Sequence, residues 1–109
     1  MLSSDPDGPV TVLSVFDIDV DSRDAFLQIW SERAAFLRHQ PGFVSLFVLQ
    51  AVSAAAQFQV VAVSTWKDLE AVHTVAVHDG FIQTARRATD ELKVIAHPGV
   101  YRMALRVAD

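Results

Sequence analysis

The alternation of apolar and polar positions divides the first half of the chain into a strand and a helix. Residues 10–20 are rich in β-branched and aromatic side chains and predict a first strand. From 21 to about 39, apolar residues recur at helical spacing, and Asp21 or Ser22 is placed to cap this helix with a side-chain oxygen. Pro41 ends the helix, because proline lacks the N–H that a helix interior needs.

The second half of the chain predicts two more strands, a broken helix and a last strand. Apolar runs at 43–52 and 57–66 are joined by a hairpin of small residues. A helical pattern over 67–92 is broken near Gly80, and a proline-glycine pair introduces a strand over 100–107. This β-α-β-β-α-β order predicts an α+β, ferredoxin-like fold with an antiparallel sheet.

Length and composition predict one domain with a cavity or an oligomeric interface. We expect a single domain over 10–109, preceded by a flexible lead-in at 1–9 that lacks apolar periodicity. Hydrophobic residues make up 51% of the 109 residues, which is more than the small core of such a chain needs. The excess predicts an enclosed apolar cavity, an apolar surface hidden in an oligomer, or both.

The faces of the predicted strands favour the oligomer. Alternate side chains of a strand point to opposite faces of the sheet, and two helices can cover only one of these faces. The other face still carries Val61 and Val63, and the run at 43–52 is apolar on both sides. A second sheet packed against that face would bury these side chains, so the pattern predicts a homodimer built face to face.

Charge and residue types argue against several classes of function. The formal net charge is −4 from 9 basic and 13 acidic residues, and without a basic stripe nucleic acid is not an expected partner. No apolar run approaches the roughly 20 residues that cross a bilayer. The first residues carry no signal-peptide pattern, so we expect a cytoplasmic protein. The chain has no cysteine, which excludes thiol catalysis and thiolate metal ligands.

Several short motifs together resemble the antibiotic biosynthesis monooxygenase family. They are Pro41-Gly42-Phe43, Val63-Ser64-Thr65-Trp66, Asp68-Leu69-Glu70-Ala71, and His73 followed by the His-x-x-Phe element from His78 to Phe81. The resemblance covers about residues 10–107 and implies a dimeric α+β barrel. The family includes cofactor-free oxygenases that oxidise aromatic polyketides such as anthrones to quinones, haem-degrading enzymes and other activities.

The resemblance also implies where a site lies. In the anthrone oxygenases, the residues that match Trp66 and Arg86 border the substrate pocket. Those enzymes carry an asparagine where this chain has Ala62 and a tyrosine where it has Val72. A site of this kind would therefore be lined here with apolar groups.

On this basis we predict a cofactor-independent oxygenase that uses O₂ on a polycyclic aromatic or quinol-type substrate. His73 is the candidate base or anchor, Arg86 the candidate anion stabiliser, and Trp66 the candidate stacking surface. Further candidate substrate-binding residues are Ser14, Ser64, His78 and Phe81. The expected ligand is a small hydrophobic aromatic molecule, and we expect no metal and no cofactor.

Several residues have a structural interpretation beside the functional one. The tryptophan can simply close the core, and Arg86 and Arg87 can pair with Asp90 or Glu91 on a solvated helix. Arg33 interrupts the apolar stripe of the first helix, so it either extends to solvent or serves a cavity.

Three alternative functions stay open at this point. The same pocket can cyclise or isomerise a polyketide, or the protein can bind an apolar ligand without changing it. Haem degradation is a less favoured alternative, because the matching iron-ligating position falls near Thr84, and only a small gap brings His78 close to it.

Overall fold

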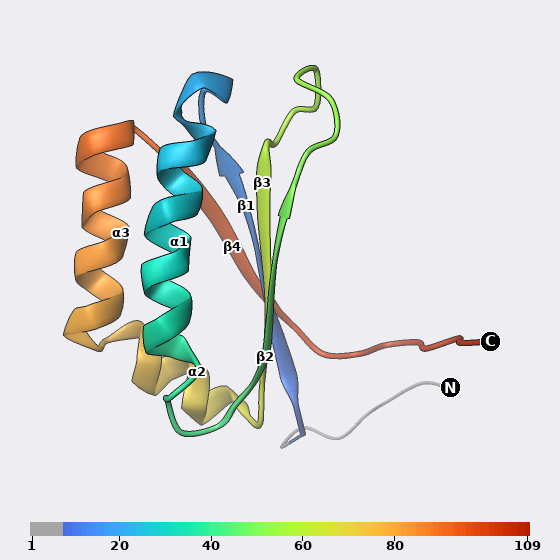
Figure 1. Cartoon of the computed structure of the whole chain (residues 1–109). Helices are drawn as coiled ribbons and strands as arrows, with labels where there is room; N and C mark the ends of the chain where they lie inside the picture. Colours follow the sequence, from blue (N-terminus) through green and yellow to red (C-terminus); the bar gives the residue numbers. More distant parts are fainter. Residues whose placement is uncertain (1–7) are drawn as a thin grey trace.

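The computed structural model describes residues 8–109, which form a four-stranded antiparallel sheet with all helices on one face (Figure 1). The elements are β1 (Val10–Asp17), a short 3₁₀ helix η1 (Val20–Ser22), α1 (Arg23–Leu37), β2 (Phe43–Gln50), β3 (Val60–Trp66), α2 (Leu69–Ala76), α3 (Asp79–Leu92) and β4 (Ile95–Tyr101). The strand order is β2-β3-β1-β4, and every neighbouring pair is antiparallel. This confirms the predicted α+β, ferredoxin-like fold. Residues 1–7 of the expected lead-in lie outside the described residues.

The predicted position of the last strand is wrong. β4 runs over Ile95–Tyr101 and contains Pro98, whereas residues 102–109 have no regular secondary structure. Pro98 lies opposite Ser14 of β1, and β4 is an edge strand with no neighbour on its other side. Proline is tolerated at a sheet edge because that side of the strand has no hydrogen-bond partner. In the interior of a sheet, a proline is expected where a strand starts. Because β4 is an edge strand, Pro98 can lie within it.

The predicted cap of the first helix is also wrong. Ser22 occupies the N-cap position of α1, but its side chain makes no capping hydrogen bond. The chain enters α1 through η1 instead, where the backbone N–H of Ser22 donates to the carbonyl of Asp19 at 2.9 Å. The two later helices do have side-chain caps: Asp68 accepts from the N–H of Ala71 in α2, and His78 caps α3.

Three predicted strands are longer than the observed ones, since β2 ends at Gln50 rather than at residue 52. β1 ends at Asp17 because η1 begins three residues later, and β3 begins only at Val60. Gln59, just before β3, is buried, and its side-chain amide donates to three carbonyls of the preceding hairpin: those of Ser53, Ala54 and Ala56. These bonds, with the backbone bond of 2.9 Å from the Ala51 N–H to the Gln59 carbonyl, hold the hairpin beyond the regular strand pairing.

A corner between α1, β2 and α2 explains the proline-glycine motif. Gly42 has a φ of +85°, which favours glycine, and a Cβ at this position would lie 2.6 Å from the Cβ of Ala71. The carbonyl of Gly42 accepts a hydrogen bond of 2.7 Å from the N–H of Lys67, directly after β3. The motif therefore joins two segments of the fold at close range.

The covered face of the sheet packs against α1 through aromatic side chains. Phe16 of β1 contacts Phe26 and Trp30 of α1 edge-on, with ring centroids 4.9 and 5.8 Å apart. All three are buried. These contacts fix α1 across the sheet, and Phe16 and Trp30 form part of the wall of the site described below.

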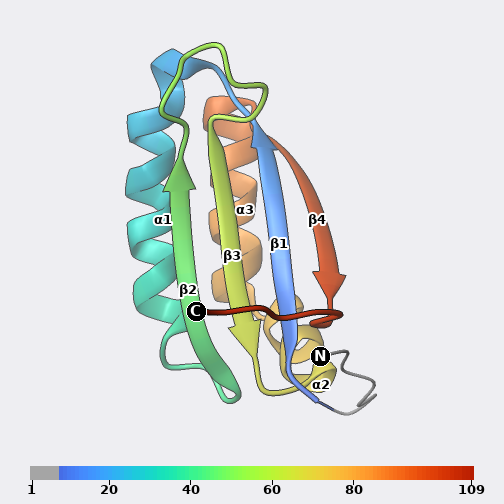
Figure 2. The ribbon, with the colours of Figure 1, turned by 90° about the vertical axis from the view of Figure 1, so that its right-hand side faces the viewer.

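The opposite face, here called the open face, has no helix over it (Figure 2). It presents Leu13 and Val15 of β1, Val61 and Val63 of β3, and Phe47 and Leu49 of β2, which the register places opposite one another. Phe47 is 62% exposed and Leu49 is 55% exposed. The C-terminal residues 102–109 project from this side of the sheet, away from the helices (Figure 1), and expose Met103, Leu105 and Val107.

Candidate functional site

A cavity of about 420 Å³ lies between the covered face of the sheet and the three helices. Alternate residues of β1, β3 and β4 line its floor, and many of them are small: Ser14, Ala62, Ser64, Ala96 and Pro98. The helices contribute Trp30 and Leu37 from α1, Val72 from α2 and Phe81 and Ala85 from α3. Small side chains on the strands leave the space, and large ones on the helices enclose it.

The wall of this cavity is nearly all apolar. Its polar side chains are Ser14, Ser64, Arg33 and His73, together with the indole groups of two tryptophans. Pockets of this size and character bind apolar small molecules, with a few polar groups that set the orientation. The exposed lining residues belong to α2 and β4, and His73 is among them. The cavity therefore opens between these two elements.

Arg33 is the one charged side chain that is buried among residues 8–109, with 6% of its surface exposed. Its Nε donates to the hydroxyl of Thr84 at 2.9 Å, and its Nη2 donates to the carbonyl of Phe81 at 3.3 Å. The guanidinium lies 4.8 Å from the ring centroid of Trp30 and 4.4 Å from that of Phe81. Of the two alternatives that the sequence left open for Arg33, the structure shows the second: it lines the cavity.

Burial lowers the pKa of Arg33 to about 10, because the charged form loses hydration. The guanidinium is still charged at neutral pH. The ion pairs within residues 8–109 are Arg87 with Glu32 and His97 with Asp17, and neither involves a residue of the cavity wall. Neutral acceptors and two aromatic faces therefore surround the charge of Arg33.

Trp66 is both core and cavity wall. It is 2% exposed, and the ring of Phe43 packs edge-on against it at 5.5 Å. Its Nε1 donates to the hydroxyl of Ser64 at 2.9 Å, which satisfies the buried N–H. Both residues line the cavity, so Trp66 presents its ring there rather than a free donor.

The structure brings five of the seven predicted site residues to one cavity: Ser14, Ser64, Trp66, His73 and Phe81. His78 does not line it, since its Nδ1 accepts from the N–H of Gly80 at 3.0 Å and its ring packs against Phe36. Arg86 is exposed on α3 and does not line it either. Its neighbour Arg87 is also exposed and pairs with Glu32 of α1 at 2.9 Å, rather than with Asp90 or Glu91.

Trp30 of α1 also lines the cavity, and the sequence prediction assigned it no role. It lies across the guanidinium of Arg33, three residues later. Its Nε1 is buried and has no acceptor among the described residues. A charged residue within the apolar stripe of α1 was the signal that pointed to this part of the wall.

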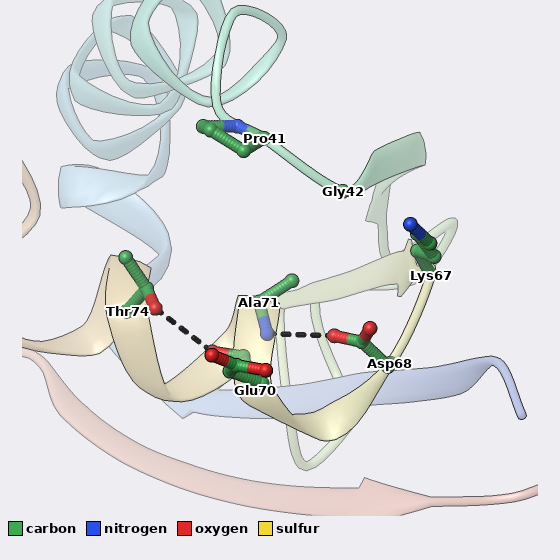
Figure 3. Close-up of a pocket in the computed structure, with 7 residues that line it drawn as sticks. All are labelled: Pro41, Gly42, Lys67, Asp68, Glu70, Ala71 and Thr74. Carbon is green, nitrogen blue, oxygen red and sulfur yellow. Dashed lines mark hydrogen bonds between the residues drawn. The ribbon is translucent and has the colours of Figure 1, made fainter. Parts of the chain in front are cut away.

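A second, shallower hollow of about 200 Å³ lies at the corner between Pro41 and α2 (Figure 3). Its polar groups build the start of the helix: Asp68 Oδ1 accepts from the N–H of Ala71 at 2.9 Å, and the Thr74 hydroxyl donates to the carbonyl of Glu70 at 3.0 Å (Figure 3). The Pro41-Gly42-Phe43 and Asp68-Leu69-Glu70-Ala71 motifs therefore have a structural role at this corner. The polar candidate residues Ser14, Ser64 and His73 line the larger cavity instead.

The part of the chain that the structure describes contains neither a metal-binding cluster nor a membrane-spanning helix. Among residues 8–109, no group of three or more His, Asp or Glu side chains is arranged to hold a metal ion. No helix within this range is long and apolar enough to span a bilayer.

An antiparallel sheet with helices on one face and a ligand-sized cavity beneath them places this protein among the ferredoxin-like α+β proteins with an internal pocket. The sequence assigns the protein to a narrower class than the fold does. The chain belongs to the antibiotic biosynthesis monooxygenase family, whose sequence profile matches residues 9–87. This shows the family that the motifs predicted.

Solved structures agree on the fold. The chain is similar to SnoaB, a cofactor-independent oxygenase from Streptomyces nogalater, at 22% identity over 94% of this chain and 99% of that one, with a TM-score of 0.80. A conserved protein from Methanosarcina mazei matches at 14% identity over 87% and 92% of the two chains, with a TM-score of 0.76. At these identities the likeness shows the fold alone. No curated protein sequence matches the chain closely enough to count as a relative.

Proposed function

We propose that this protein is a cofactor-independent monooxygenase that oxidises a polycyclic aromatic or quinol-type substrate, such as a polyketide, with O₂. The observation that carries the proposal is the cavity of about 420 Å³, with apolar and aromatic walls, a guanidinium inside and an imidazole at its mouth. Membership of a monooxygenase family supports it, as does the likeness to SnoaB, which is described as a cofactor-independent oxygenase.

The reaction needs little from the protein beyond proton transfer and a dry site. A base removes a proton from an activated CH₂ group, and the resulting carbanion, stabilised as an enolate, is electron-rich enough to reduce O₂. The new C–O bond gives a peroxide, which takes up the proton. Loss of the second C–H proton and cleavage of the O–O bond then leave a carbonyl and release water. In total, CH₂ and O₂ become C=O and H₂O, and no external reductant is consumed.

The lining residues can be assigned to the steps of this proposed reaction. His73 at the mouth is the proposed base, because a neutral imidazole accepts a proton near physiological pH and this one has access to water. The rings of Trp66 and Phe81 provide surfaces for a planar substrate. The hydroxyl of Ser14, which makes no hydrogen bond to another described residue, is free to bond the substrate. Arg86 takes no part in this arrangement.

We also propose that the protein is a homodimer whose two sheets pack through their open faces, as in a dimeric α+β barrel. The exposed apolar side chains of this face support the proposal, because a soluble monomer rarely leaves so much apolar surface in water. A dimer would also cover the cavity-bearing sheet from behind and give the exposed C-terminal residues 102–109 a surface to contact.

Anthrone is a suitable probe, since its CH₂ group is acidic and its quinone product is coloured. We expect purified protein to accelerate both quinone formation and O₂ uptake in a one-to-one ratio, and His73→Gln to slow them by at least about tenfold. Arg38→Met, which changes an exposed residue beyond α1, is the matched control and should leave the rate unchanged. Turnover that continues under strict anaerobiosis would overturn the oxygenase and favour a cyclase or isomerase.

One observation favours a second candidate, a binding protein for an apolar ligand. Ala62 and Val72 line the cavity at the positions where the anthrone oxygenases carry polar side chains. A ligand that binds tightly and is recovered unchanged after incubation in air would support this candidate. Stoichiometric O₂ consumption would exclude it.

A further inference from the structure

Arg33 is a cation buried beside the cavity, and residues 8–109 give it no anionic partner. Its Nε and Nη2 donate to a hydroxyl and a carbonyl of α3, and no carboxylate of the described residues lies within ion-pair distance of it. Burial of a charge is costly unless the charge is paired, because the group loses its hydration. The folded protein therefore keeps an arginine at a position where its charge is unfavourable.

A purely structural role does not explain the charge. The hydrogen bonds to Thr84 and Phe81 tie α1 to α3. The amide nitrogen of a neutral glutamine occupies the same place along the side chain as Nε, so it can donate to the Thr84 hydroxyl with a smaller loss of hydration. What only the arginine offers is its charge and its additional donors.

One of these donors is available to a small molecule. Nη1 of Arg33 makes no hydrogen bond to a described residue. It is also absent from the nitrogens that are sealed from solvent without a partner, which are Arg23 Nε and Trp30 Nε1. The residue lines the cavity, so this accessible nitrogen has the cavity as its neighbour.

The aromatic groups around Arg33 limit the kind of ligand that can reach its guanidinium. The rings of Trp30 and Phe81 hold the guanidinium at 4.8 and 4.4 Å, and the rest of the nearby wall is apolar. A ligand that reaches Arg33 must place its polar atom there and its apolar body along the strands. An anionic oxygen on an aromatic skeleton fits this distribution.

We propose that the cavity selects an aromatic ligand that carries an oxyanion, a carboxylate or an ionised phenol, and that Arg33 binds this oxyanion through a charge-assisted hydrogen bond. The inference rests on the proposed function only in taking the cavity as the substrate site. It holds whether the ligand is oxidised, isomerised or merely bound.

Two probes of equal shape test it: naphthalene-2-carboxylate and naphthalene-2-carboxamide. Isothermal titration calorimetry at neutral pH should show the acid binding at least about tenfold more tightly than the amide to the wild-type protein. Arg33→Met should bring the two affinities within about twofold of each other, and Arg33→Lys should keep part of the preference. Arg38→Met, an exposed control, should leave it intact.

Arg86→Met separates the two arginines. If the preference for the acid disappears in this variant and survives in Arg33→Met, the oxyanion site lies at Arg86 and the proposal is wrong. Equal affinities of the two probes for the wild-type protein also overturn it, and this comparison needs no variant to fold. Circular dichroism of each variant shows whether a lost preference reflects a lost fold.

The same experiments distinguish this inference from the proposed function. A preference for the acid with no O₂ uptake on any substrate leaves the oxyanion site standing and removes the oxygenase. O₂ uptake with a neutral substrate and no preference between the probes supports the oxygenase and removes the oxyanion site.

Discussion

The two faces of the sheet are built from the same strands, yet one encloses a cavity and the other is a flat apolar surface. On β3, Ala62 and Ser64 face the helices, whereas Val61 and Val63 face the other way. The same contrast holds on β1, with Ser14 toward the cavity and Leu13 and Val15 on the open face. Small side chains under the helices leave room for a ligand.

Large side chains on the open face enclose no such space. Phe47 and Leu49 of β2 add to the apolar surface there and remain more than half exposed in the single chain. The contrast shows that residue size, and not only polarity, distinguishes the face that encloses a cavity from the open face, through which we propose that the protein dimerises. The predictions below test each side of it.

The largest effect is expected on the open face. Phe47→Glu places a charge at the centre of the proposed interface, and we expect the dissociation constant of the dimer to rise about a thousandfold, or about 4 kcal/mol. Analytical ultracentrifugation over a concentration series measures this. Val52→Glu, in the exposed hairpin, is the control and should leave the association unchanged. A wild-type protein that is monomeric at high concentration would contradict the dimer itself.

The corner that sets the covered face in place should be sensitive to a single methyl group. Gly42→Ala combines a positive φ with a contact of 2.6 Å to Ala71, so we expect a loss of about 3 kcal/mol in the free energy of unfolding. Chemical denaturation measures the loss. Adding Ala71→Gly removes the contact but not the strained φ, and it should restore part of the stability. A single variant as stable as the wild type would show that the corner yields easily.

Arg33→Met should stabilise the protein while weakening the oxyanion site. Removing an unpaired buried charge raises the free energy of unfolding by about 1 to 2 kcal/mol near neutral pH. The pKa of Arg33 is lowered in the folded state to about 10, so above that pH the folded protein releases a proton that the unfolded chain retains. Above that pH the free energy of unfolding of the wild type therefore rises relative to that of the variant. The difference in free energy between the two proteins narrows as the pH rises.

Denaturation of both proteins at pH 8 and pH 11 measures that difference. Other groups titrate equally in the two proteins and cancel. Arg38→Met, beside solvent, should show no such pH-dependent gap. A destabilised Arg33→Met variant at neutral pH would mean that the hydrogen bonds of Arg33 to α3 outweigh the cost of burying its charge.

The smallest effect concerns the floor of the cavity. Ser64→Ala removes the acceptor of the buried Trp66 N–H, and we expect a loss of about 1 kcal/mol. Ser14→Ala is the matched control, because Ser14 lines the same cavity without a hydrogen bond to another described residue. Thermal unfolding compares the two, and equal losses would show that the Trp66 bond contributes nothing specific.

Most of the element order could be predicted, because it follows from local periodicity. Two of the errors, the position of β4 and the cap of α1, depend on neighbouring elements that the local periodicity does not report. Pro98 marks the interior of a strand only because β4 is an edge, and Ser22 leaves its cap unused because η1 precedes α1. The break near Gly80 was local and was predicted.

The candidate site also combines features that local spacing predicted with features that only packing decided. Helical spacing placed Arg33 on the apolar stripe of α1, and the sequence predicted that it would either leave that stripe or serve a cavity. Arg86 and Arg87 are about 100° apart on α3, so only the rotation of that helix against α1 decides which of them faces where. In the structure neither faces the cavity, and Arg87 pairs with Glu32.

By itself the sequence determined the order of strands and helices, the family and the two-sided apolar character of the sheet, because these are carried by residues close together in the chain. The tertiary structure alone decided which small residues share a cavity and that the guanidinium of Arg33 ends beside it. Those facts depend on how distant segments pack against one another. The physical reason is that periodicity fixes the face on which a side chain lies, whereas packing fixes what that face meets.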